Sequence, residues 1–265
     1  TSRLRKRESL GADHQNGDAH RDTIASVRPL SHNPDVTTPK TDHAPERPAD
    51  RPSRAESREV RELRELKNTQ PDLASAADMQ IELLGAQKRI QSRVPLPSAA
   101  FDRRKPDNHR CRPVLQLADI PIDWTDVRLM IRQTADILRR FDTLEQPDYD
   151  RIQALARDGQ IEAVVTGWYD TAMASGVRKA EVNTHEAEIL NQVLALAMRP
   201  FLARCAEALL PRLELSEWRQ PCCPLCGGEP EFAYINPAAE RLLICGRCTG
   251  QWLFDPITCP FCENS

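Results

Sequence analysis

Three cysteine pairs with two residues between their members lie in the last 45 residues of the 265-residue sequence. They are Cys223/Cys226, Cys245/Cys248 and Cys259/Cys262. This spacing allows one tight turn to present both sulfur atoms to a single tetrahedral metal ion. Because such an ion takes two pairs, three pairs predict one complete four-thiolate site and one pair left over.

The first metal is assigned to Cys223, Cys226, Cys245 and Cys248. Eighteen residues separate Cys226 from Cys245, which fits the spacing of zinc ribbons. The alternative joins the second pair to Cys259 and Cys262 across only ten residues. Disulfide bonds or unligated thiols are the remaining possibility for the whole set.

The donor atoms also limit what such a site can do. Zinc and iron both accept four thiolates, so the ligands do not distinguish between them. Zinc would be structural, whereas iron could also carry one electron. Four protein ligands leave no open position for a substrate, which argues against a catalytic metal and, with no phosphate loop or catalytic triad, against an enzyme. Cys222 is interpreted as a bystander of the first pair.

The residues between and after the first two pairs predict a small sheet. The segments 230–235 (PEFAYI) and 241–245 (RLLIC) fit a hairpin around NPAAE, and 251–254 (QWLF) fits a third strand. Gly227 follows the second ligand, where a positive φ is expected. We therefore expect residues 217–265 to form a β-rich rubredoxin-like or zinc-ribbon-like metal domain, held by its metal because its core is small.

The preceding chain predicts two further regions. Residues 1–56 are polar and rich in proline, which is typical of a disordered tail. Residues 57–216 show helical periodicity, most clearly in the stripe of Val127, Ile131, Thr134 and Leu138. The last helical stretch contains Pro200, which should kink or split it. The expected fold class is α+β, with a helical domain followed by the metal domain.

Composition excludes several classes of partner. The net charge of the 265-residue chain is −3, and residues 217–265 carry three arginines against six acidic residues. A surface that binds nucleic acid needs the opposite balance. The sequence contains no apolar run long enough for a membrane span. Close cysteine pairs favour metal thiolates in a reducing compartment, so we expect a cytoplasmic protein.

The cysteine-rich end of the sequence resembles the FdhE family, the formate dehydrogenase accessory proteins. The resemblance lies in the segment PCCPLCGGEPEF and in the later segment RLLICGRCTGQWLFDPITCPFCEN. That family has a CPxCG turn, a Leu-x-Cys-x-x-Cys-x-x-x-Trp segment and a CPxCxN turn. In this sequence Leu243, Trp252 and Asn264 stand at the matching positions beside the cysteines. The motif similarity covers about 45 residues, and residues 57–216 are similar to the family's helical part only in outline.

The resemblance implies a fourth cysteine pair beyond Ser265, so that Cys259 and Cys262 would be half of a second rubredoxin-like site. The expectation is therefore that the chain is truncated; the alternatives are that another molecule completes the half-site or that its cysteines stay free thiols. It further implies a non-catalytic maturation factor that binds the catalytic subunit of a molybdenum or tungsten formate dehydrogenase. Two alternatives stay open: a zinc-ribbon nucleic-acid-binding protein and a rubredoxin-like electron carrier.

Overall fold

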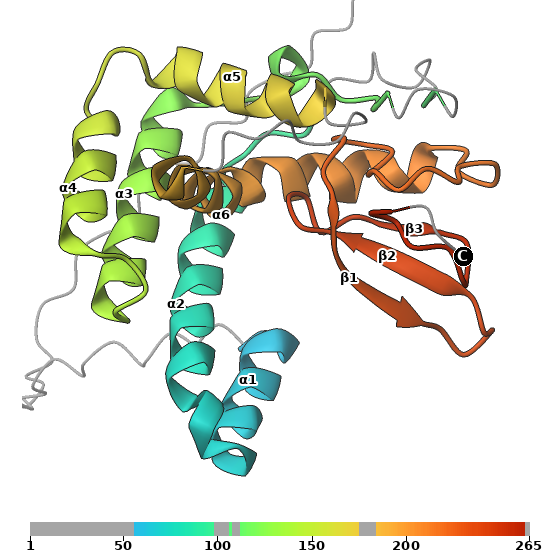
Figure 1. Ribbon diagram of the computed structural model, residues 1–265, viewed down its shortest axis with the longest axis horizontal. Coiled ribbons are helices and arrows are strands. Elements are labelled where there is room, and N and C mark those ends of the chain that lie inside the picture. Colours follow the sequence, from blue (N-terminus) through green and yellow to red (C-terminus); the bar gives the residue numbers. More distant parts are fainter. Residues whose placement is uncertain (1–55, 98–105, 108–111, 175–183, 263–265) are drawn as a thin grey trace, which may run out of the picture. The chain divides into compact units, whose positions relative to one another are not determined.

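The computed structural model describes residues 56–97, 106–107, 112–174 and 184–262. The predicted tail, residues 1–56, lies outside this range except for its last residue. Within the described range, helices precede a small antiparallel sheet, as Figure 1 shows. The predicted α+β class is thus confirmed.

Within the described residues, six α-helices form the helical part and three strands form the sheet. The helices are α1 (Arg58–Thr69), α2 (Ala74–Gln91), α3 (Trp124–Arg140), α4 (Gln146–Leu155), α5 (Ile161–Ala174) and α6 (His185–Leu209). Short 3-10 turns lie at Pro71–Leu73, Leu117–Asp119 and Leu210–Arg212. The strands are β1 (Pro230–Ile235), β2 (Arg241–Cys245) and β3 (Gln251–Leu253).

Helix α3 illustrates why these segments become helices. The Asp123 carboxylate caps its first turn by accepting a hydrogen bond from the Thr125 backbone N–H at 2.8 Å. The predicted stripe from Val127 to Leu138 is buried, and its apolar side chains pack in one hydrophobic core with α2 and α6. Burial of this stripe stabilises the helix more than intrinsic propensity does.

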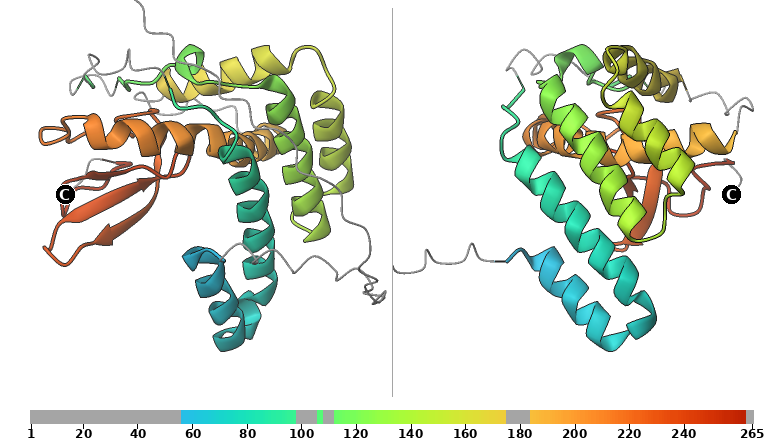
Figure 2. Two further views of the ribbon diagram at one scale, coloured as in Figure 1. Left: turned by 180° about the vertical axis from the view of Figure 1, so that it is seen from behind. Right: turned by 90° about the vertical axis from the view of Figure 1, so that its left-hand side faces the viewer.

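Helix α6 continues through Pro200 instead of splitting there. Proline lacks a backbone N–H and costs a mid-helix hydrogen bond. The side chains around Pro200 offset that cost, because Ala197, Met198, Phe201 and Leu202 are all buried. Packing of α6 against α2 and α3 therefore overrides the local break signal. In Figures 1 and 2, α6 runs beside the sheet as well as beside these two helices.

The sheet confirms the three predicted strands. It is antiparallel in the order β1-β2-β3, with Phe232 opposite Ile244 and Leu243 opposite Trp252. The Asn236 side chain closes the hairpin by accepting hydrogen bonds from the backbone N–H groups of Ala238 and Glu240. Leu243 and Trp252 are buried and lie in the same hydrophobic cluster as α6.

The helices and the cysteine-bearing residues share one hydrophobic core. Leu225, Trp218 and four of the paired cysteines belong to the same buried cluster as the side chains of α2, α3 and α6. We call residues 217–262 the cysteine module, after their sequence rather than after an observed boundary. The division into 57–216 and 217–265 remains a prediction. Because the core is continuous, side chains of the cysteine module pack against those of the helices.

Candidate metal centre

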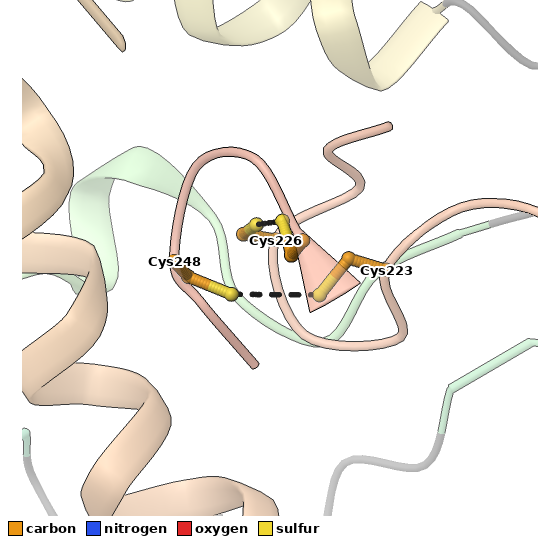
Figure 3. A group of neighbouring side chains, drawn as sticks. Cys223, Cys226 and Cys248 are labelled. Atoms are coloured by element: carbon orange, nitrogen blue, oxygen red, sulfur yellow. Dashed lines mark hydrogen bonds between the residues drawn. The ribbon is translucent and has the colours of Figure 1, made fainter. Parts of the chain in front are cut away.

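Four buried sulfur atoms come together at the junction of the cysteine module with the helices. They belong to Cys223, Cys226, Cys245 and Cys248, and all lie within 4.8 Å of one another. Cys223 and Cys248 are 3.6 Å apart, and Cys226 and Cys245 are 3.5 Å apart. Figure 3 shows the labelled side chains turned toward a common centre. The pairing of the first two turns is the one that the spacing predicts.

These distances fit a tetrahedral thiolate site. A metal–sulfur bond of about 2.3 Å places sulfur atoms about 3.8 Å apart at the corners of a tetrahedron. A disulfide bond would hold two sulfur atoms about 2.0 Å apart, and all four cysteines are free of such bonds. Disulfide pairing among these four cysteines is thus excluded. The four residues present therefore fit a metal ion with soft-ligand preference, either zinc or iron.

The two turns that carry the cysteines repeat the same backbone pattern. The Cys223 carbonyl accepts a hydrogen bond from the Gly227 N–H, and the Cys223 N–H donates to the Gly228 carbonyl. The Cys245 carbonyl accepts from the Thr249 N–H, and the Cys245 N–H donates to the Gly250 carbonyl. This repeat places the two sulfur atoms of each turn on one side of the backbone.

Each turn requires a positive φ four residues after its first cysteine. Gly227 meets this requirement at 70°, as its lack of a Cβ predicts. In the second turn the residue is Thr249 at 58°. A β-branched residue is strained in this region, so the surrounding hydrogen bonds and packing must hold it there. A glycine therefore marks the positive φ of the first turn in the sequence, whereas the threonine of the second turn does not mark it.

Backbone N–H groups point at the sulfur atoms of the second turn. The Arg247 N–H donates to Cys245 Sγ and the Gly250 N–H donates to Cys248 Sγ, both at 3.4 Å. Such bonds stabilise thiolates and fix the ligand geometry. A Cβ at Gly250 would lie 2.5 Å from Leu210 Cδ1 and 3.1 Å from Cys248 Sγ, so a larger residue there would displace the Leu210 side chain.

The electrostatics of the cluster favour a cation at its centre. Burial raises the pKa of the Cys223 thiol, whereas hydrogen bonding from Cys223 and the other thiols lowers the pKa of Cys245. Four thiolates confined together in a buried site repel one another, so all four cannot ionise without a positive charge between them. A bound metal ion would supply that charge, and four protein ligands would close its coordination shell.

The first turn is held against the helical part by main-chain hydrogen bonds. The Val114 and Leu115 N–H groups donate to the carbonyls of Pro224 and Leu225 at 3.1 and 2.9 Å. The hydroxyl of Tyr169, on α5, donates to the Leu115 carbonyl at 2.9 Å. Tyr169 is fully buried. Helix α5 therefore holds Leu115 in place, and Leu115 in turn binds the first ligand turn.

The second turn is held by α6. Arg199 Nη2 donates to the Gly246 carbonyl at 2.6 Å and reaches Glu231 on β1 at 3.3 Å. Gly246 lies between the two ligands of this turn, so the contact ties the turn directly to the longest helix. Sequence reasoning missed Tyr169 and Arg199, since an isolated tyrosine or arginine on a helix carries no local signal of a distant partner.

Cys259 and Cys262 lie apart from the four-sulfur cluster. Cys259 is half-buried and Cys262 is exposed. Among the described residues, only the first four cysteines form a group of three or more metal ligands. The backbone N–H groups of Phe261 and Cys262 lower the pKa of Cys259, which resembles the sulfur-directed hydrogen bonding of the second turn. Metal binding by this third pair stays a prediction.

Replacing Cys259 by serine tests the separation of the third pair from the cluster. We expect the metal content per chain and the melting temperature to stay near those of the unmodified protein, because Cys259 lies outside the closed four-sulfur site. Elemental analysis and thermal melting measure the two quantities. Loss of a full equivalent of metal in Cys259→Ser would show instead that the third pair already binds an ion in this chain.

Cys222 and Cys205 fall outside the ligand set as well. Cys222 is disulfide-bonded, which removes its sulfur as a thiolate ligand and agrees with its interpretation as a bystander. Cys205 is fully buried in α6, where burial raises the pKa of its thiol to about 12. It acts as a small apolar side chain in the core.

The fold and the cluster define a class of protein: an α+β chain whose four cysteines, on two turns of a small antiparallel sheet, form a closed thiolate site suited to a metal ion. No protein-family model and no curated protein matches the chain. Among solved structures it is similar to the crystal structure of the FdhE protein from Pseudomonas aeruginosa. The two are 18% identical with a TM-score of 0.45, over 78% of this chain and 68% of that one. No described helix is both long and apolar enough to cross a bilayer.

Proposed function

We propose that this protein is a non-catalytic accessory factor that binds the catalytic subunit of a molybdenum or tungsten formate dehydrogenase in the cytoplasm and assists its assembly. The observation that carries the proposal is the four-sulfur cluster. It is built from the same residues whose motifs resemble the FdhE family, namely the CPLCG turn and the second pair with Leu243 and Trp252.

The metal in this proposal has a structural role, with a redox role as the alternative. Four thiolates would fill the coordination shell of zinc or iron and leave no position for a substrate. The bound ion would make two turns and a short sheet rigid, because metal binding and folding are coupled in sites of this kind. Cys223, Cys226, Cys245 and Cys248 would hold it, and their backbone hydrogen bonds would fix their geometry.

A candidate surface for the client lies on the cysteine module. A hollow of about 420 Å³ is lined by residues of β1 and β2 together with the segment 257–261. Three large apolar side chains at this hollow are strongly exposed: Phe232 at 64%, Ile257 at 76% and Phe261 at 64%. Apolar side chains gathered on an exposed surface mark sites of protein interaction, so we assign client binding to this face.

Affinity purification tests the client assignment. The tagged protein is expressed in a host that makes a molybdenum formate dehydrogenase, and bound proteins are identified by mass spectrometry. We expect recovery of the catalytic subunit, and at least tenfold less of it with the double variant Phe232→Ser, Phe261→Ser. A matched double variant on the helical part, Leu73→Ser with Leu96→Ser, removes two exposed apolar side chains and should leave recovery unchanged.

The outcomes separate the proposed client from the alternative functions. Absence of any molybdoenzyme subunit from the recovered proteins would contradict the accessory role. A red protein that contains iron and accepts one electron would favour the rubredoxin-like carrier. Salt-sensitive retention of DNA or RNA on a filter would favour the nucleic-acid-binding protein.

A further inference from the structure

Arg247 lies between the second pair of cysteines and α5. It stands one residue before Cys248 and two after Cys245, on the turn that carries both. Its guanidinium carbon lies 3.9 Å from the ring centroid of Trp168 and 6.0 Å from that of Tyr169. At the shorter distance a cation–π interaction is strong, and more so where water is excluded.

The hydrogen bonding of this guanidinium is incomplete. Arg247 Nη2 donates to the Trp168 carbonyl at 3.4 Å. Arg247 Nη1 is buried and has no hydrogen-bond partner in the described part of the chain. A buried cation with unused donors is costly unless a negative charge lies nearby. Burial lowers the pKa of the Arg247 guanidinium, and negative charge on Cys226 and Cys245 acts in the opposite direction.

The side chains of Arg247 and Cys245 both pack against the backbone of Gly228. A Cβ on Gly228 would lie 2.8 Å from Cys245 Sγ and 3.0 Å from Arg247 Cδ. The glycine of the first turn thus lets the sulfur of the second turn and the stem of Arg247 approach the same backbone. Beyond Gly228, the guanidinium of Arg247 lies over the ring of Trp168.

We propose that Arg247 is a positioning residue that balances the negative charge of the metal–thiolate cluster and couples metal binding to the packing of α5. Four thiolates around a divalent ion carry a net charge of about −2, which a fixed guanidinium partly offsets. The same guanidinium stacks on Trp168. Release of the ion loosens the second turn, on which Arg247 stands, and the contact with α5 then weakens.

Through this coupling, the packing of α5 would depend on whether the cysteine module holds its metal ion. Helix α5 carries both Trp168 and Tyr169, and Tyr169 supports the segment beside the first turn. A change at Arg247 is therefore transmitted to α5 through Trp168 and returns to the ligands through Leu115. This inference rests on the proposed metal site and is independent of the client.

The test uses the full chain loaded with Zn²⁺. Zinc affinity is measured by competition with a chromophoric chelator, and the packing of α5 by hydrogen exchange of its backbone amides. We expect Arg247→Met to bind zinc about 10- to 100-fold more weakly, as for other residues that support metal ligands. In the zinc-loaded variant, α5 amides should exchange faster than in the unmodified protein, while β2 amides stay protected.

Two further variants separate charge from stacking. Arg247→Lys keeps the positive charge and should recover most of the zinc affinity without restoring the protection of α5, because an ammonium lacks the planar stack. Trp168→Leu keeps the guanidinium, so zinc affinity should fall less than in Arg247→Met, while α5 protection no longer depends on zinc. The control is Arg128→Met on α3, which removes a guanidinium that donates to the carbonyls of Ala156 and Asp158.

The proposed role of Arg247 is overturned if Arg247→Met binds zinc within about twofold of the unmodified protein. It is also overturned if Arg247→Lys binds zinc no more tightly than Arg247→Met does. Unchanged α5 exchange in zinc-loaded Trp168→Leu also overturns it. If the unmodified protein binds neither zinc nor iron, the proposed metal site fails and the coupling fails with it, whereas absence of a client alone leaves the coupling intact.

Discussion

Serine in place of Cys226 is expected to release the metal and unfold the cysteine module. Cys226 is fully buried, and its sulfur lies 3.5 Å from that of Cys245. A closed site of this kind supplies about 10–16 kcal/mol of metal-binding free energy that is also folding free energy, and loss of one ligand removes part of it. The effect should exceed the usual range for a single substitution, about 0.5–3 kcal/mol.

Metal content, near-ultraviolet circular dichroism and melting temperature measure this outcome. Cys248→Ser should behave in the same way, since both sulfur atoms belong to the same cluster. The matched control is Cys205→Ser, which makes the same chemical change at a buried cysteine of α6 and should retain the metal. A full equivalent of tightly bound metal in Cys226→Ser, with unchanged melting, would refute the ligand assignment.

Alanine in place of Tyr169 should produce the second large loss. The side chain is fully buried, its hydroxyl binds the Leu115 carbonyl, and its ring lies within the core next to the ligand turns. Truncation leaves a cavity and an unpaired carbonyl, and the free energy of unfolding should fall by about 3–5 kcal/mol. Denaturant unfolding of the metal-loaded protein measures this change.

The phenylalanine variant isolates the hydroxyl. Tyr169→Phe keeps the ring and removes only the hydrogen bond to Leu115, so a loss of about 1–3 kcal/mol is expected from the unpaired buried carbonyl. The metal content should stay at its normal value in this variant. Equal stability of Tyr169→Phe and Tyr169→Ala would show that the ring contributes nothing, and the assigned packing role would then be wrong.

The four-sulfur cluster and the sheet were predictable from local patterns. Two residues between cysteines restrict both sulfur atoms to one turn, and eighteen residues between the first two pairs suit one hairpin. Residues 230–235 and 241–245 became strands with the bounds that alternation and turn signals indicated. The buried stripe of α3 followed from its periodicity in the same way. These features depend on neighbours close in the chain, which is why the sequence alone determined them.

Tertiary structure alone decided how the cluster is supported. Pro200 stays inside a continuous helix because its neighbours are buried. Thr249 takes a positive φ in a turn that α6 holds through the hydrogen bond from Arg199 to the Gly246 carbonyl. Tyr169 donates to the Leu115 carbonyl, 54 residues away in the sequence, and Arg247 donates to the Trp168 carbonyl, 79 residues away. Such contacts depend on the packing of distant segments around a shared core, a property that no local spacing encodes.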